Sequence, residues 1–109
     1  NIGGYEGLNY AISHAQGELV AVYHSDDVYA PEIVAREVAF LEEHTDAGAV
    51  FTMDHYIDED GVRFGGTSVP PELGGTGLLS HEQLFRHMLR HKNIVLRCPT
   101  FMARASVLA

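Results

Sequence analysis

Two adjacent carboxylates, Asp26 and Asp27, follow closely after an apolar run that ends at Tyr23. Neighbouring acids repel one another unless a positive group shares their site. A hard divalent cation such as Mg²⁺ or Mn²⁺ binds one or two carboxylates together with phosphate oxygens of a substrate. The alternative interpretation is a strand-to-helix turn, begun by His24 and Ser25, in which the acids only accept backbone hydrogen bonds. Position and residue type alone leave both interpretations open.

The apolar run over residues 19–23 must position these acids. It is too short for a helix and has no polar alternation, so we expect a strand buried on both faces, as in the middle of a parallel sheet. In open α/β sheets, ligands bind in the crevice at the carboxyl ends of the strands. Asp26 and Asp27 would lie at such an end.

Helical and extended patterns alternate along the rest of the chain. Apolar spacing and end signals, including Gly17 after the first helix, Pro31 at the start of the second and a Ser80–Gln83 capping box, predict helices over residues 8–15, 31–44 and 80–89. Strands are expected over residues 19–23, 49–53, 55–57, 62–64, 94–96 and 101–103, with a loop over 65–77. The alternation predicts an α/β fold.

Composition limits the class of protein. The 109 residues have 46% hydrophobic content and a mean hydropathy of -0.03, which suits one globular domain and excludes a disordered acidic tail. No run approaches the roughly 18 apolar residues of a membrane-spanning helix, and no signal peptide is visible. Both ends look cut, so we expect an incomplete domain that depends on other segments or a partner for stability. An oligomer is compatible with this expectation.

The charge balance limits the partners. Fifteen acidic residues against seven basic ones give a net charge of -8, and the basic residues form no stripe. A nucleic-acid partner is therefore not expected. A polyphosphate ligand would need a bridging divalent cation. The single cysteine, Cys98, excludes an internal disulfide and fits a reducing compartment.

Three weaker candidates favour structural interpretations. His87 and His91 have the i, i+4 spacing that can bind zinc, but no third ligand is evident, so a solvated or partly packed helix face is favoured. The acids of residues 54–60 are similar to a calcium loop without its regular spacing, and a plain hairpin turn is favoured. The glycine-rich loop over 65–77 lacks the Gly-Lys-Ser/Thr ending of a phosphate loop, so a mobile loop is favoured.

The residues of the first third resemble the family 2 nucleotide-sugar glycosyltransferases. The resemblance rests on order, spacing and type together, in Asn1-x-Gly3, in Leu8-Asn9 with Ala11, in Ala15-x-Gly17-Glu18-Leu19-Val20 and in Ser25-Asp26-Asp27-x-Tyr29-x-Pro31-Glu32. Residues 50–54, 58–61 and 99–104 also fit, so that the resemblance covers most of the chain.

The resemblance implies an A-type glycosyltransferase fold, which is a Rossmann-like, mostly parallel sheet flanked by helices. It divides the chain into a nucleotide-sugar and metal-binding part, residues 1–64, and a part with a loop, a helix and the start of the acceptor side, residues 65–109. It assigns Asp26 and Asp27 to a divalent metal, Mg²⁺ or Mn²⁺. It assigns the nucleotide sugar to these two acids together with His24 and Asn9.

Two positions depart from the family pattern. His24 stands where the Asp-x-Asp-like motif has its first acid, and imidazole suits a hard cation less well than a carboxylate. Leu8 stands where many members carry Arg before the Asn. The resemblance therefore leaves open how many protein ligands bind the metal. At Leu8 this chain also lacks the positive charge that many members place near the nucleotide.

The implied function is metal-dependent, inverting transfer of a hexosyl-type sugar from a nucleoside-diphospho-sugar to an acceptor hydroxyl. The acceptor, a saccharide, a lipid-linked sugar or a protein, is left open. The family's catalytic base lies beyond the matched residues, so these residues alone should be inactive. We expect a cytoplasmic protein, with any membrane association through other segments. The alternatives are a non-catalytic sugar-nucleotide-binding or structural α/β module, and a metal-dependent nucleotidyltransferase.

Overall fold

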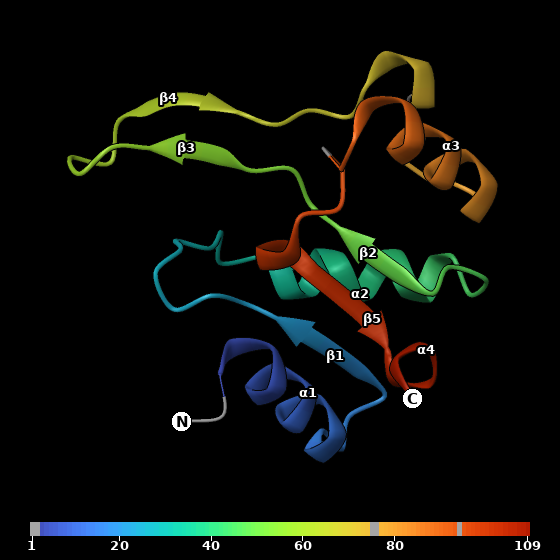
Figure 1. The fold of residues 1–109 in the computed structure, drawn as a ribbon. Helices are drawn as coiled ribbons and strands as arrows, with labels where there is room; N and C mark the ends of the chain where they lie inside the picture. The colour runs from blue at the N-terminus through green and yellow to red at the C-terminus, as the bar shows by residue number, and fades with distance from the viewer. Residues whose placement is uncertain (1–2, 75–76, 94) are drawn as a thin grey trace.

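A computed structural model describes residues 3–74, 77–93 and 95–109, and its helices and strands alternate as expected (Figure 1). The elements are, in chain order, α1 (Gly4–His14), β1 (Leu19–Val22), α2 (Ile33–Glu43), β2 (Ala49–Phe51), β3 (His55–Ile57), β4 (Arg63–Gly66), the 3₁₀ turn η1 (Pro71–Leu73), α3 (His81–His91), the 3₁₀ turn η2 (Cys98–Thr100), β5 (Phe101–Arg104) and α4 (Ala105–Leu108). The α/β class is therefore confirmed.

The sheets differ from the expected parallel arrangement. The three-stranded sheet has the order β1-β5-β2, and β5 is antiparallel to both neighbours. Strands β1 and β2 therefore run in the same direction without pairing with each other. Met102 and Ala103 of β5 are 3% and 0% exposed. The most buried residues of the sheet therefore lie on the central strand, between β1 and β2. The expectation of a mostly parallel sheet is wrong for the described strands, which pair only antiparallel.

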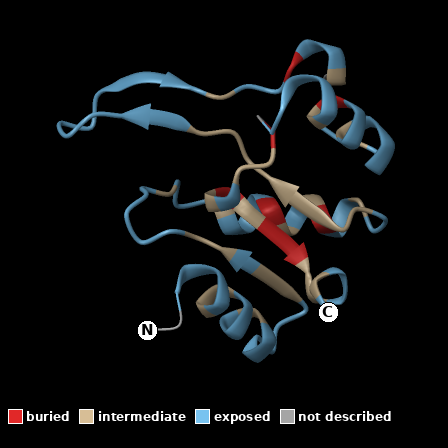
Figure 2. Cartoon of the chain, viewed as in Figure 1, coloured by how far each residue is buried: buried red, intermediate tan, exposed pale blue. Residues whose placement is uncertain are grey.

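Strand β1 is also less buried than expected. Leu19, Val20 and Val22 are half-buried and Ala21 is exposed, because β5 is the only described strand that pairs with β1. Helix α1 lines a groove with β1 but has no fully buried residue. Figure 2 shows buried residues on β5 and α2 and also near α3, whereas β1 has none.

Helix α2 is joined to the sheet by polar contacts as well as by apolar ones. Leu41 is fully buried, and the Arg104 guanidinium at the end of β5 donates to the carbonyl oxygens of Leu41 at 2.6 Å and Ala47 at 2.9 Å. These bonds satisfy carbonyl groups at and beyond the helix end and place a cation at its negative pole. Arg104 therefore links β5 to the end of α2.

Glu37 is the buried acid of α2. It is 1% exposed, and Tyr23, directly after β1, donates a hydrogen bond of 2.5 Å to its Oε2. Its other carboxylate oxygen has no hydrogen-bond partner among the described residues. Burial raises the pKa of Glu37, although the hydrogen bond from Tyr23 opposes this shift. Burial and the nearby carboxylate likewise raise the pKa of Tyr23.

The local elements follow their sequence signals, with small differences at their ends. The β3–β4 hairpin is confirmed, and Asp58 Oδ1 accepts hydrogen bonds from the backbone of Asp60 and Val62 in its turn. The capping box of Ser80 and Gln83 at the start of α3 is confirmed. Helix α1 ends before Gly17, α2 begins after Pro31, and the 65–77 loop contains the end of β4 and the turn η1.

Two expectations are limited by what the structure describes. The strand expected over residues 94–96 is wrong for residues 95 and 96, which form no strand, and position 94 lies outside the described residues. Among the described helices, none combines the length and apolar character needed to cross a bilayer.

Glu37 predicts a specific pH dependence of stability. Because the folded pKa lies above the ordinary value of 4.5, the folded state binds this proton more tightly than the unfolded state. The free energy of unfolding should therefore fall as pH rises from 4.5 through the raised pKa. Glu37→Gln should reduce this fall, by at most about 1.4 kcal/mol per pH unit, in denaturant titrations of the full-length protein. The control is Glu42→Gln, on the exposed face of α2, which should keep the wild-type dependence of the free energy of unfolding on pH. The same pH dependence in Glu37→Gln and the wild type would contradict the prediction.

Candidate functional site

Three of the four predicted binding residues come together in the loop that follows β1. His24, Asp26 and Asp27 each place a potential ligand atom within 4.8 Å of the others, and all three are exposed. His24 Nδ1 lies 4.0 Å from Asp27 Oδ2. The two carboxylates therefore converge on one accessible point, with an imidazole beside them.

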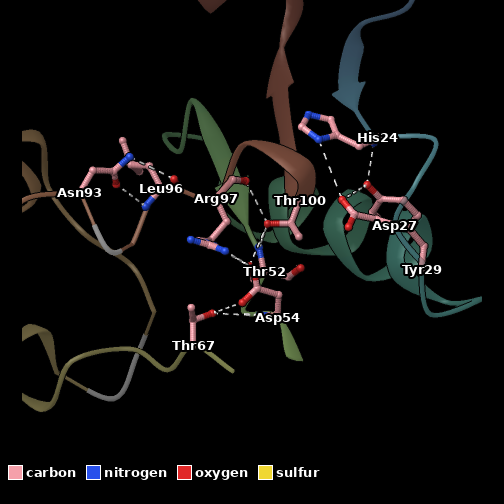
Figure 3. A network of polar contacts seen from close by, with 10 residues as sticks. All are labelled: His24, Asp27, Tyr29, Thr52, Asp54, Thr67, Asn93, Leu96, Arg97 and Thr100. Carbon is pink, nitrogen blue, oxygen red and sulfur yellow. Dashed lines mark hydrogen bonds and ion pairs between the residues drawn. The ribbon is translucent and has the colours of Figure 1, made fainter. Parts of the chain in front are cut away.

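Tyr29 holds this loop in place. Its hydroxyl accepts a hydrogen bond of 2.7 Å from the backbone N–H of His24, and it lies 3.4 Å from Asp27 Oδ2 (Figure 3). Its ring packs against that of Tyr23, with 4.7 Å between centroids. Burial raises the pKa of Tyr29, as does the nearby carboxylate of Asp27, against the effect of the His24 bond. Sequence reasoning names Tyr29 only as part of the family motif and misses this role; its position two residues after Asp27 is the available signal.

The donor atoms fit a hard divalent cation. Carboxylates suit Mg²⁺ and Mn²⁺, and these ions keep several positions for water or substrate phosphates. Side-chain exposures of 45% for His24 and 46% for Asp27 leave room for such a ligand. The imidazole of His24 is a softer donor, and it can instead hydrogen-bond a hydroxyl of a bound molecule.

The fourth predicted binding residue, Asn9, lies on a different element. It lies on the exposed surface of α1, while the cluster lies in the loop after β1. Any ligand that contacts both must reach from the loop to the helix.

A second polar network lies on the other side of the turn η2 (Figure 3). Arg97 contacts Asp54 Oδ2 with two nitrogens: Nε donates a hydrogen bond of 2.8 Å, and Nη2 lies 2.7 Å away. The Thr67 hydroxyl donates a hydrogen bond of 2.7 Å to the other carboxylate oxygen, Asp54 Oδ1. Thr100 Oγ1 accepts from the Thr52 backbone N–H at 3.1 Å and donates to the Thr52 carbonyl at 2.8 Å. The network joins the end of β2 and the hairpin to η2, which itself contacts β1.

The charge pair in this network is tight. Partial burial opposes ionisation of Asp54, but hydrogen bonds from Thr67 and Arg97 and the positive charge of Arg97 hold its pKa below the ordinary value. Sequence reasoning missed the pair, because 43 residues separate its members and no local pattern links them.

The third cluster contains the two histidines of α3. His87 Nδ1 and His91 Nε2 lie 3.8 Å and 3.7 Å from Glu72 Oε1 in η1. A third potential ligand, which was not evident in the sequence, therefore lies beside the pair. His87 is buried and His91 is exposed, so this helix face is partly packed, as one of the expected alternatives. Glu72 has no sequence signal, because it lies in a separate element, η1, and no local spacing links it to the histidines of α3.

Comparisons with known proteins place these sites in context. A family model described as Glycosyl transferase family 2 matches residues 1–109. "Putative glycosyltransferase EpsE" of Bacillus subtilis (strain 168) is 35% identical over 80 residues, which are 73% of this chain and 28% of that protein. "Uncharacterized glycosyltransferase MJ1057" of Methanocaldococcus jannaschii is 28% identical over 61 residues, or 56% of this chain and 21% of that protein. The alignments thus span less than a third of either relative, and no solved structure matches significantly.

Replacing Tyr29 by Phe tests its contact with the loop. Tyr29→Phe removes the acceptor for the His24 N–H, so the free energy of unfolding should fall by about 1 kcal/mol and the His24 amide should exchange hydrogen faster. Tyr5→Phe is the matched control, because the Tyr5 side chain is 89% exposed. An unchanged exchange rate at His24 would show that Tyr29 does not restrain the loop.

Arg97→Met tests the Asp54 ion pair. The loss of charged hydrogen bonds should lower the free energy of unfolding at neutral pH by about 1–3 kcal/mol in urea titrations. Because the folded pKa of Asp54 lies below 3.8, this stabilisation is present above that pH and is lost as pH falls through the folded value. The difference between variant and wild type should therefore shrink in acid.

Arg86→Met is the control for the ion pair. Arg86 pairs with Glu82 on the surface of α3, where their side chains are 76% and 72% exposed. Its loss should change stability by at most about 1 kcal/mol. Equal effects of Arg97→Met and Arg86→Met would contradict a special role for the Asp54 pair.

Proposed function

Because the chain belongs to glycosyl transferase family 2, we propose that its protein transfers a sugar from a nucleoside-diphospho-sugar to an acceptor hydroxyl, with inversion. The observation that carries the proposal is the convergence of Asp26 and Asp27 in the loop after β1, inside the residues that match the family. A crevice at the end of a sheet strand is where α/β folds bind ligands. The transferred group is proposed to be a hexosyl-type sugar.

The acid pair is proposed to bind the donor through a divalent cation, Mg²⁺ or Mn²⁺. The net charge of -8 disfavours direct binding of a diphosphate, whereas a cation held by Asp26 and Asp27 would attract it. When bound, the cation would offset the negative charge that develops on the departing nucleoside diphosphate.

The remaining protein groups orient the donor. His24 is proposed to hydrogen-bond a ribose hydroxyl, and its backbone position is set by the bond to Tyr29. Asn9 is proposed to contact the nucleotide from α1. Residues 1–64 would thus form the donor and metal part, and residues 65–109 would begin the acceptor side.

No general base is assigned within the chain. Inverting transfer needs a base within hydrogen-bond reach of the acceptor hydroxyl, and the resemblance places that residue beyond Arg104. Residues 1–109 alone are therefore proposed to be inactive. The acceptor is a saccharide, a lipid-linked sugar or a protein, and the protein is proposed to act in the cytoplasm, with any membrane association made by other segments.

Asp26→Asn in the full-length protein tests the donor site. Mn²⁺-dependent binding of nucleoside diphosphates, measured by calorimetry across a panel of bases, should weaken about tenfold or more, because a ligand has been removed. The control is Asp46→Asn, an exposed acid beyond α2 that lies outside the cluster. Equal affinity of Asp26→Asn and wild type would overturn the site assignment.

Turnover separates the proposed activity from its alternatives. Transfer from a labelled sugar nucleotide by the full-length protein supports a glycosyltransferase. Donor binding without turnover indicates a binding module. Release of pyrophosphate from a nucleoside triphosphate and a sugar phosphate indicates a nucleotidyltransferase.

A further inference from the structure

We propose that Glu72, His87 and His91 form a second metal site, which binds Zn²⁺ or a similar transition-metal ion and fastens η1 to α3. This site is separate from the acid pair after β1 and does not depend on the proposed transfer activity. One potential ligand atom from each residue lies within 4.8 Å of the other two.

The distances leave space for an ion among the three groups. Glu72 Oε1 lies 3.8 Å from His87 Nδ1 and 3.7 Å from His91 Nε2, so neither contact is a hydrogen bond. With metal–ligand bonds of about 2.0–2.2 Å, neighbouring ligands of a tetrahedral ion lie roughly 3.4 Å apart. A contraction of a few tenths of an ångström would therefore bring the two Glu72–histidine separations to ligand spacing, and the third separation lies within 4.8 Å.

The three proposed ligands differ in exposure: one is buried, and two are accessible to solvent. The His87 side chain is 2% exposed, whereas those of His91 and Glu72 are 42% and 53% exposed. The histidines are one helical turn apart, with 4.9 Å between ring centroids, so α3 holds two ligands on one face. An ion can enter from the exposed side, and water can occupy its fourth position.

His87 presents its Nδ1 to the cluster. This nitrogen faces Glu72 Oε1 across 3.8 Å, which is too long for a hydrogen bond. An ion bound between the two atoms would replace this long contact with two ligand bonds. The other ring nitrogen, Nε2, is buried without a hydrogen-bond partner among the described residues and takes no part in the proposed site.

Ligand type separates this site from the acid pair. Two imidazoles and one carboxylate suit Zn²⁺, Co²⁺ and similar ions, whereas two exposed carboxylates suit Mg²⁺ or Mn²⁺. The two sites would therefore differ in selectivity: the acid pair would bind hard cations, and the site on α3 would bind borderline ones.

The structural consequence is a clamp across the connection from η1 to α3. Glu72 lies in η1, before α3 begins at His81, and His87 and His91 lie in the later turns of that helix. An ion bound by all three residues would hold the two elements together. Since it binds the folded arrangement, it should also stabilise the protein.

The test uses the full-length protein stripped of metal and titrated with Co²⁺, followed by competition with Zn²⁺. We expect visible absorption typical of tetrahedral Co²⁺, which Zn²⁺ displaces, and a Zn²⁺-dependent rise in melting temperature. His91→Ala and Glu72→Gln should each weaken Zn²⁺ binding about tenfold or more and abolish the thermal shift. Both residues are partly exposed, so these variants should fold even if a variant at buried His87 does not.

The matched controls are His81→Ala and Glu82→Gln, exposed residues at the start of α3 and outside the cluster. Both variants should bind Zn²⁺ with wild-type affinity. Asp26→Asn, which removes a proposed ligand of the other site, should do so too. Wild-type Zn²⁺ affinity in His91→Ala and Glu72→Gln would overturn the proposal. So would loss of the Co²⁺ absorption in Asp26→Asn, because the ion would then lie at the acid pair.

Discussion

The pairing of β5 between β1 and β2 is the constraint on which the other arrangements depend. It buries Met102 and Ala103 and sets the register of both neighbours. Through Arg104 it also holds the end of α2. Because η2 leads directly into β5 and contacts β1, this pairing also brings β1 close to the turn that carries Thr100 of the Asp54–Arg97 network.

Polar contacts, as well as the apolar core, hold distant segments of this small fold together. Few large side chains are fully buried, and one of them is the acid Glu37, bonded to Tyr23. Arg97 and Arg104 each connect segments far apart in sequence. Such contacts fix distances and directions more closely than apolar packing does, which suits a loop that must present two carboxylates to a ligand.

The two clusters of metal-ligating residues differ in how the fold builds them. His24, Asp26 and Asp27 are neighbours in sequence, and one loop held by Tyr29 presents them to solvent. The cluster on α3 needs a second segment, since Glu72 comes from η1. The first cluster is open to a large phosphate-bearing ligand, whereas the second encloses a buried imidazole.

Local sequence patterns suffice to predict the α/β alternation, the capped start of α3, the β3–β4 hairpin and the acid pair after β1, because each depends on residues a few positions apart. The family resemblance was equally local, and the family match confirms it. Three contacts became visible in the folded chain alone: β5 lies between β1 and β2, Arg97 pairs with Asp54, and Glu72 lies beside the histidines of α3. Those contacts join residues far apart in the chain, and their partners are selected by burial and charge in the folded state, which no local spacing records.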